Sequence, residues 1–542
     1  MKRIALEDLA VYLLLGAYVI WAGLFIFQSS YVGIDGHRYF GLFDDAMISM
    51  RYAWNFAHAQ GLVWNAGQRV EGYSNLLMTL MMAAAALFLN KSLAVLAVQI
   101  IGIPVILLIA YLTRRIAIEL QLGEPYAALI GLLALGCVLV YYPLSYWTLM
   151  GMETGLLTLF ILAGVWFALS WLRMERRSDL AAVSITSGLA FLTRNDAILL
   201  AAVTFAYLGL EVFLHRKQAA RMRPLLGAAL LVGLFPLGQT VFRLAYYGEI
   251  LPNTYYLKLT GIPLLIRFIG GSRFVLEFLQ ESWPLFAFAA LGLVLKFRLS
   301  RLYLAAFMAV AVAYQIYAGG DPWESWRLLA PAMPALFILA IEGALAGAAR
   351  LGVLASRRYA LATGVCILIV LSLALADQPF LADMAVRGPT SAAIANRVNT
   401  NAAIAIDVLT APGASIGVIW AGTLPYYTDR IGVDFLGKSD PRIARLPADI
   451  TGSVSWGGMI SVPGHNKYDL NYSIVELQPT YIQVYSWGYQ TVKPWVVQHY
   501  VRADYQGVAG SKTVWLLKDS PLVCWDACKS QYRIVPWPDT QN

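Results

Sequence analysis

Long apolar runs separated by short polar loops make up most of this 542-residue chain. A helix needs about 20 apolar residues to cross about 30 Å of hydrocarbon, and eleven runs come near that length. The first run is too long and too uninterrupted for a cleaved signal peptide. The pattern therefore predicts a polytopic α-helical membrane protein with about eleven transmembrane helices. The eleven runs are Leu9–Phe27, Leu93–Leu112, Ala127–Tyr142, Gly155–Trp171, Leu180–Leu192, Ala197–Leu214, Pro224–Tyr246, Trp283–Leu295, Tyr303–Tyr317, Leu328–Leu345 and Tyr359–Ala376.

The composition and the placement of charge agree with this pattern. Hydrophobic residues are 59% and charged residues 13% of the chain, whereas a soluble domain has about 25% charged residues. The net charge of +8 would indicate a nucleic-acid surface only if the basic residues shared one soluble face. Instead, basic residues gather in alternate loops, which are expected to stay in the cytoplasm. We therefore predict a cytoplasmic amino terminus and no nucleic-acid partner. The basic loops contain Arg114 and Arg115; Arg173, Arg176 and Arg177; Arg216, Lys217, Arg221 and Arg223; Lys296, Arg298 and Arg301; and Arg350, Arg357 and Arg358.

The remaining segments are expected outside the cytoplasm. The apolar run Leu76–Leu89 has about 14 residues, which is short for a crossing, so we predict a juxtamembrane helix that contacts membrane lipids. Two domains follow: a transmembrane domain at 1–376, with a first external loop at 28–91, and an extracytoplasmic α/β domain at 377–542. In the second domain we expect a helix at Thr390–Leu409 and strands at Ile416–Trp420, Ile431–Phe435, Tyr481–Tyr485 and Val514–Leu517.

Two adjacent acids begin a helical pattern in the first external loop. Asp44 and Asp45 stand at the start of the apolar segment that contains Arg51. One acid would suffice to cap a helix. A second one beside a membrane is costly unless it binds a cation or accepts a proton, so the pair indicates catalysis or ligand binding, with helix capping as the alternative.

The same loop continues with glycines, aromatic groups, amides and charges over residues 61–75, a composition that suits a sugar; a turn-rich loop packed on the membrane is the alternative. Near the carboxyl terminus, Cys524 and Cys528 are close enough to form a disulfide, which is plausible in an oxidising compartment. A pair of metal thiolates is the alternative, although no third cysteine lies nearby.

The order of motifs resembles the GT-C membrane glycosyltransferases, and within them it is closest to the terminal arabinofuranosyltransferases that use polyprenyl-phosphate arabinose. The resemblance covers most of the chain, and the first-loop motif is its most specific part. The matching segments are residues 44–53, 61–65 and 70–75 in the first loop; Gly151–Thr154; Leu192–Arg194; Leu251–Tyr256; Gly319–Asp321 followed by Arg327; Val433–Gly437; Asp440 and Pro441; and Pro463–Lys467.

The resemblance implies a reaction mechanism. A polyprenyl phosphate is a good leaving group, so the enzyme needs a base for the acceptor hydroxyl and cations for the phosphate. Asp44 is the predicted base, while Asp45 would orient the acceptor, raise the pKa of the base or bind a divalent cation.

Other residues of the matching motifs are candidates for substrate contact. Arg194 and Arg327 would bind the donor phosphate; alternatively, Asp196 would neutralise Arg194, and Asp321 and Glu324 would neutralise Arg327. Arg51 could instead pair with Asp45. The further candidates for substrate binding are Arg51, Glu71, Tyr73, Asn75, Glu153, Asn253, Asp321 and His465.

The resemblance therefore implies an inverting glycosyltransferase in a bacterial inner membrane. It would move arabinofuranose from a polyprenyl-phosphate donor to a glycan, lipopolysaccharide or protein acceptor on the outer face. A transporter or flippase of lipid-linked sugars is the main alternative, but it would favour internal repeats and acids in the middle of helices. A non-catalytic assembly or sensor protein is a third possibility, although it would not need the paired aspartates.

Overall fold

The chain folds into two compact units, each made of segments that are distant in the sequence. A computed structural model describes residues 6–122, 126–215, 220–323, 325–350, 358–455, 458–483, 488–505, 512–526 and 532–535. The helical unit consists of Met1–Phe25, Ile100–Val241 and Arg267–Arg387. The mixed unit consists of Ile26–Gln99, Phe242–Ile266 and Gly388–Asn542. The mixed unit therefore combines the segment after the first apolar run with the carboxyl-terminal region.

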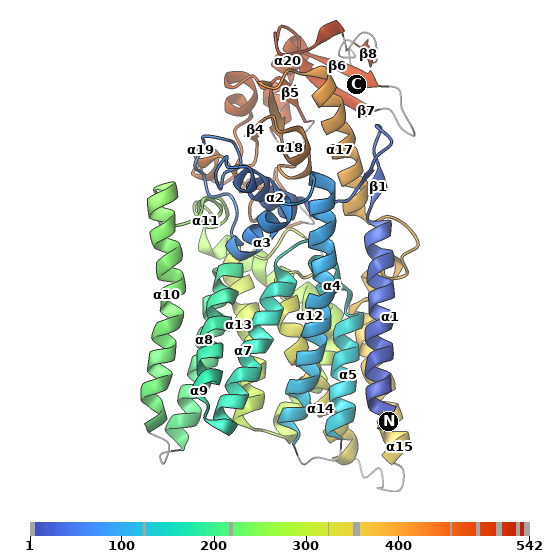
Figure 1. Cartoon of the computed structure of the whole chain (residues 1–542), viewed down its shortest axis with the longest axis vertical. Helices are drawn as coiled ribbons and strands as arrows, with labels where there is room; N and C mark the ends of the chain where they lie inside the picture. The colour runs from blue at the N-terminus through green and yellow to red at the C-terminus, as the bar shows by residue number, and fades with distance from the viewer. Residues whose placement is uncertain are drawn as a thin grey trace. The chain divides into compact units, whose positions relative to one another are not determined.

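The apolar runs form helices, as the sequence predicts (Figure 1). Across the described residues, eight helices are long and apolar enough to cross a membrane, and ten crossings result if each of two bent pairs counts as one. The run Leu180–Leu192 lies in α8, whose 17 residues carry Arg177 and Asp179 in the first turn, so it is the weakest of the eleven expected spans. The long helices are α1 (Leu6–Gln28), α4 (Lys91–Leu120), α5 (Ala127–Val140), α7 (Thr154–Met174), α8 (Arg177–Thr193), α9 (Ala197–Leu214), α10 (Met222–Tyr247), α12 (Leu264–Leu295), α13 (Leu299–Ala318), α14 (Met333–Arg350) and α15 (Arg358–Ala376).

In each of the two bent pairs, two helices meet at an angle across a short break in the helix. Helix α5 and the buried helix α6 (Tyr142–Leu149) meet at 53°, where Tyr141 is extended and Pro143 occupies the first turn of α6. Proline lacks an N–H and fixes φ, so it suits a helix start but interrupts a continuous helix. The second bend, of 63°, joins α15 to a short helical segment at Gln378–Met384.

The mixed unit contains a six-stranded sheet and several shorter helices. The strands run in the order β4-β3-β5-β7-β6-β8, in which β3 pairs in parallel with β4 and β5, and the remaining pairs are antiparallel. The predicted strands correspond to β3, β4, β5 and β7, and the predicted helix to α17, whereas β6 and β8 were not expected. The elements are the hairpin β1 (Tyr31–Val32) and β2 (Arg38–Tyr39), α2 (Asp44–Ala57), α3 (Leu76–Ala86), α11 (Asn253–Leu259), α17 (Ser391–Leu409), β3 (Ser415–Val418), α18 (Thr423–Thr428), β4 (Ile431–Asp434), α19 (Pro441–Ala444), a π-helical turn (Asn471–Glu476), β5 (Tyr481–Ile482), α20 (Tyr489–His499), β6 (Tyr500–Tyr505), β7 (Lys512–Leu517) and β8 (Tyr532–Val535).

A single apolar core joins the first-loop segment to the sheet within the mixed unit. Tyr52 and Trp64 are buried among residues of α17, β3 and β7. The indole Nε1 of Trp64 donates to the carbonyl of Ala421 at 3.0 Å, and a side chain on Gly432 would clash with the indole ring. This packing holds α2 and the first-loop residues after it against β4 and the residues that follow β3. The 11 residues of α3 agree with the expectation that the run at Leu76 does not cross a membrane.

Candidate functional site

The carboxylate of Asp44 is buried and bound by the start of another helix. Asp44 begins α2, and the preceding Phe43 makes no side-chain cap. The Asp44 carboxylate accepts hydrogen bonds from the backbone N–H groups of Gly422 at 3.2 Å and Thr423 at 3.1 Å. Only 7% of the residue is exposed. Asp44 thus satisfies free N–H groups at the start of α18, whereas the capping alternative concerned the helix that Asp44 itself begins.

The environment of Asp44 also keeps its carboxylate basic. The pKa of Asp44 is raised to about 6. Burial is the largest cause, because the charged form loses hydration, and the neighbouring Asp45 acts in the same direction. The cation of Lys438 and the N–H groups of Thr423 and Gly422 act in the opposite direction. A carboxyl group with this pKa is ionised at neutral pH and still accepts a proton more readily than an exposed aspartate does.

Asp45 pairs with a lysine from the carboxyl-terminal region. The Lys438 ammonium donates to the Asp45 carboxylate, and the two side chains are 12% and 17% exposed. Although burial acts to lower the pKa of Lys438, the carboxylates of Asp45 and Asp44 raise it above its usual value. Lys438 is therefore a cation at neutral pH, and its ammonium is bound to one oxygen of the Asp45 carboxylate.

The residues around Asp45 do not favour a divalent cation. Hard cations need several oxygen ligands, and no group of three or more His, Cys, Asp or Glu side chains with metal-binding geometry occurs among the residues that the structure describes. The Lys438 ammonium would also repel a second cation. We therefore assign no metal to this site.

A network of hydrogen bonds fixes the loop that presents Lys438. The carboxylate of Asp434, at the end of β4, accepts from the N–H groups of Leu436 at 3.0 Å and Ser439 at 2.7 Å. From the other side, the Asn253 amide donates to the carbonyls of Gly437 at 2.9 Å and Lys438 at 3.1 Å. Asn253, a candidate from sequence, therefore positions the backbone of this loop.

His465 lies in the same cluster as a neutral group. The residue is buried. Burial lowers its pKa to about 3, and the cations of Lys438 and Lys258 add to that effect, while Asp45 opposes it. His465 is thus an uncharged imidazole at neutral pH, close to the acid pair. The sequence singled it out, but it did not indicate burial.

The remaining first-loop candidates have partners within the mixed unit. Glu71 forms an ion pair with Arg243 at 2.7 Å, with both side chains 4% exposed, and burial raises the pKa of Glu71 to about 6 against the effect of that arginine. The hydroxyl of Tyr73 lies 3.2 Å from that of Tyr247. Asn75 accepts a hydrogen bond from Ser49 at 3.0 Å. These contacts anchor the loop to neighbouring elements.

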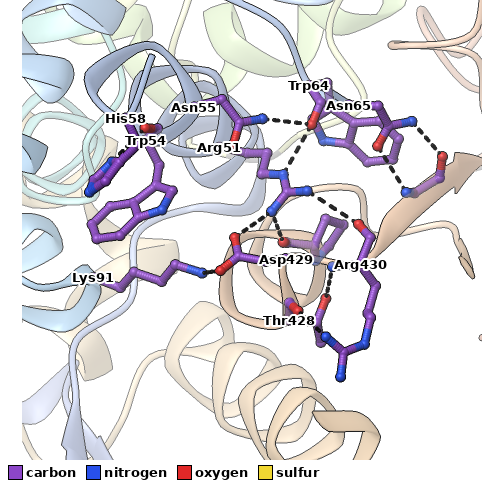
Figure 2. A network of polar contacts seen from close by, with 12 residues as sticks. Arg51, Trp54, Asn55, His58, Trp64, Asn65, Lys91, Thr428, Asp429 and Arg430 are labelled. Carbon is purple, nitrogen blue, oxygen red and sulfur yellow. Dashed lines mark hydrogen bonds and ion pairs between the residues drawn. The ribbon is translucent and has the colours of Figure 1, made fainter. Parts of the chain in front are cut away.

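Arg51 connects α2 to Trp64 of the first loop, to α18 and to the residues that follow α18 (Figure 2). Its guanidinium donates to the carbonyls of Trp64 at 3.0 Å, Pro425 at 2.9 Å and Arg430 at 3.2 Å, and to the Asp429 carboxylate at 2.8 Å. The expected pair between Arg51 and Asp45 is not observed. Asp44 and Arg51 are seven residues apart, about two helical turns, so one face of α2 contacts both ends of the six-residue α18.

In the helical unit, Arg194 lies between two acids. It binds Asp196 through two nitrogens at 3.0 and 2.8 Å, and it binds Glu153 at 2.8 Å. The alternative partner Asp196 is therefore observed, and Glu153 joins it. A cavity of about 40 Å³ beside Arg194 is lined mostly by apolar side chains, including Leu200 and Phe307.

Arg327 also has a carboxylate partner. It binds Asp321 at 2.5 and 3.1 Å, and both side chains are buried. Its guanidinium lies 5.7 Å from the centre of the Trp147 ring. Glu324, the second expected partner, lies outside the described residues. The same holds for Cys528, so the disulfide to the exposed Cys524 stays a prediction.

The structure thus sorts the candidates into separate clusters. Asp44, Asp45, Asn253 and His465 gather around Lys438, which the sequence did not single out. The other pairs are Arg51 with Asp429, Glu71 with Arg243, Arg194 with Glu153 and Asp196, and Arg327 with Asp321. Lys438 lies between two matching motifs, Val433–Gly437 and Asp440–Pro441, and this position is the sequence feature that could have singled it out.

Comparison with known structures identifies the architecture. ArnT from Cupriavidus metallidurans bound to undecaprenyl phosphate aligns over 94% of this chain and 98% of its own, with a TM-score of 0.57 and 14% identity. In its apo state the coverage is 93% and 97%, with a TM-score of 0.55 and 16% identity. The chain has the GT-C fold.

A second GT-C protein shows the same likeness. The archaeal oligosaccharyltransferase AglB from Archaeoglobus fulgidus, in complex with an inhibitory peptide and a dolichol-phosphate, aligns over 92% of this chain and 74% of its own, with a TM-score of 0.51 and 12% identity. Residues 386–532 match a domain of unknown function, DUF8728. No match was found among curated protein sequences. The GT-C fold is thus shared with membrane proteins that bind polyprenyl phosphates.

Proposed function

We propose that this protein is a membrane glycosyltransferase that moves a sugar from a polyprenyl-phosphate donor to an acceptor of the cell envelope. The observation that carries the proposal is the acid pair at the start of α2, with Asp44 buried and Asp45 partly exposed, in a chain with the GT-C fold. The likeness to structures of ArnT and AglB with undecaprenyl phosphate and dolichol-phosphate supports the donor class. The first-loop motif supports arabinofuranose as the sugar, with a glycan, lipopolysaccharide or protein as acceptor.

The proposed reaction is a single displacement. The acceptor hydroxyl oxygen attacks the anomeric carbon, the bond from that carbon to the phosphate oxygen breaks, and polyprenyl phosphate leaves with the electron pair. Asp44 takes the hydroxyl proton. A carboxylate offers about four acceptor positions, so the bonds from Gly422 and Thr423 leave room for the acceptor. Attack from the face opposite the phosphate inverts the anomeric centre.

We propose Arg194 and Arg327 as the donor-phosphate residues. Guanidinium groups suit phosphate because their charge is permanent and their donors form a planar fork. Since both arginines are paired with carboxylates, the phosphate would have to compete with Asp196, Glu153 or Asp321 for the same donors. We propose that the reaction takes place on the outer face of a bacterial inner membrane and that residues 377–542 lie on that side.

Mass spectrometry of envelope glycans tests this function in the cell. A deletion strain should lack one sugar on a defined acceptor, and the full-length protein should restore it, whereas Asp44→Asn should not. The Arg442→Gln variant is a matched control, because it removes an exposed ion pair in the same unit. Unchanged glycans in the deletion strain would contradict the proposal. Lipid-linked sugar that accumulates on the inner face would indicate a flippase instead.

A further inference from the structure

The carboxyl edge of the sheet supplies the partners of both acids. Strands β3 and β4 are parallel neighbours, with Val418 opposite Asp434 at their ends. The chain leaves β3 toward Gly422 and Thr423, which bind Asp44, and it leaves β4 toward Lys438, which binds Asp45. In open α/β sheets, ligands bind at this edge. Here the edge is occupied by the two carboxylates of α2.

The loop with Lys438 is built more rigidly than an ordinary ion pair requires. The Asp434 carboxylate accepts from the N–H groups of Leu436, Gly437 and Ser439. The Asn253 amide donates to the carbonyls of Gly437, Lys438 and Asp440. Residues that support a reacting group are typically locked in this way. A buried ion pair adds little net stability by itself, because desolvation offsets the attraction. The arrangement is therefore better suited to orienting a carboxylate than to stabilising the fold.

We propose that Lys438 is a positioning residue of the transfer reaction, which holds the Asp45 carboxylate in place and keeps it from turning toward Asp44. This inference rests on the proposed glycosyltransferase function. Lys438 does not contact the reacting atoms in this account; it acts through the acid pair. The substrate class is unchanged, but the carboxyl-terminal region becomes a part of the reacting site.

The electrostatics of the cluster support the geometry. The charged and titratable groups around Lys438 are Asp44 and Asp45 on α2, Asp434 at the end of β4, and the neutral His465, which also faces Lys258. Lys438 lowers the pKa of Asp44 against the effects of burial and of Asp45. Removal of the lysine charge would leave two adjacent carboxylates without their nearest cation, so Asp44 would hold its proton to a higher pH.

The test uses the full-length protein in detergent or nanodiscs, with a labelled polyprenyl-phosphate sugar and an acceptor glycan. Lys438→Gln should lower kcat by about 100-fold, since general-base catalysis contributes about 10²–10⁴-fold, and should leave KM for the donor within about twofold. The acidic limb of the kcat–pH profile should also move to higher pH, because the lysine charge no longer lowers the pKa of Asp44. Lys438→Arg, which keeps the charge, should restore kcat to within about tenfold and return the limb. Arg442→Gln should behave like the wild type.

The outcomes separate this inference from the function on which it rests. Wild-type protein without transfer activity would overturn the proposed function, and this inference with it. Active wild type together with Lys438→Gln of unchanged kcat and pH profile would overturn the inference alone. A rise in KM for the donor at unchanged kcat would do so too, because it would assign Lys438 to phosphate binding. If Lys438→Gln does not fold, the Lys438→Arg variant decides. A folded arginine variant whose kcat–pH profile has a shifted acidic limb would contradict the positioning role.

Discussion

Arg51 provides a sharp test, because the sequence suggests substrate contact and the structure shows a connection between elements. The Arg51→Met substitution keeps an unbranched apolar stem about as far as the Nε position but removes every donor. The guanidinium binds the carbonyls of Trp64, Pro425 and Arg430 and the carboxylate of Asp429, as Figure 2 shows. The substitution therefore tests whether these bonds hold α18 in place.

The expected cost follows from these partners. The Trp64 carbonyl keeps a second donor, Asn55, at 3.0 Å, and Asp429 keeps Lys91 at 2.5 Å. Because the Asp429 side chain is 56% exposed, its pair with Arg51 contributes at most about 1 kcal/mol. The carbonyls of Pro425 and Arg430 each lose a buried hydrogen bond, at about 1–3 kcal/mol apiece. Together these losses amount to about 2–7 kcal/mol, and we take about 3 kcal/mol, in the lower part of this range, as the expected cost.

Thermal unfolding of the detergent-solubilised protein, followed by tryptophan fluorescence, measures this loss. For a unit of this size, about 3 kcal/mol lowers Tm by roughly 6–12 °C. The matched control Arg442→Met breaks a pair with Glu476 in which both side chains are about half exposed, so its Tm should stay within about 2 °C. An Arg51→Met variant with wild-type Tm and a raised KM would refute the reasoning and make Arg51 a substrate ligand.

Four further predictions concern Asp44, Gly422 and Asn65. Because burial raises the pKa of Asp44 to about 6 and a base must be ionised to act, kcat/KM should fall as the pH drops through about 6. A fall of kcat/KM only near pH 4 would contradict the role of Asp44 as the base. The same raised pKa means that Asp44 contributes to the free energy of unfolding below about pH 4, and that this contribution is lost as the pH rises through about 6. Unfolding of the wild type and of Asp44→Asn, compared over this pH range, measures the contribution. Gly422→Ala would place a Cβ 2.2 Å from the Asp44 carbonyl oxygen, so the rate of sugar transfer should fall at least about tenfold. The control Gly413→Ala, whose Cβ would have nothing within 4 Å, should keep full activity. Equal activities of the two variants would show that the contact between Gly422 and Asp44 is dispensable. Asn65→Ala removes a donor and an acceptor that pair with the N–H and C=O of one β4 residue, so unfolding should show a loss of about 2 kcal/mol, and an unchanged Tm would contradict this role.

The apolar pattern predicted the helices well, because a long apolar run leaves a chain few alternatives to a buried or membrane-spanning helix. The same holds for four strands, whose β-branched and aromatic residues lie between turn signals. Strand β6 was missed because Tyr500–Tyr505 mixes charged and apolar residues. The bend before α6 depends on one proline, whose effect a hydropathy pattern does not capture.

The site was predicted only as far as its local motifs reach. Asp44 and Asp45 stood out because two adjacent acids beside an apolar run are unusual. Their partners did not, since Lys438 is 393 residues from Asp45 and Gly422 is 378 residues from Asp44. For Arg51 the sequence offered Asp45, in the same helix, as the alternative to a substrate, yet its observed partners are Trp64, a residue of α18 and the residues after α18. Spatial neighbours of this kind are set by the packing of the sheet against α2, which no short sequence window contains.

The most direct measurement is transfer by the purified full-length protein, with product and by-product followed together. With a labelled polyprenyl-phosphate arabinofuranose and an envelope glycan, the account predicts a new glycosidic bond of inverted configuration and one polyprenyl phosphate released for each sugar transferred. Asp44→Asn should abolish both signals, and Arg442→Gln should keep them. Sugar transfer by Asp44→Asn at the wild-type rate, or no glycosidic bond from any polyprenyl-phosphate sugar, would contradict it.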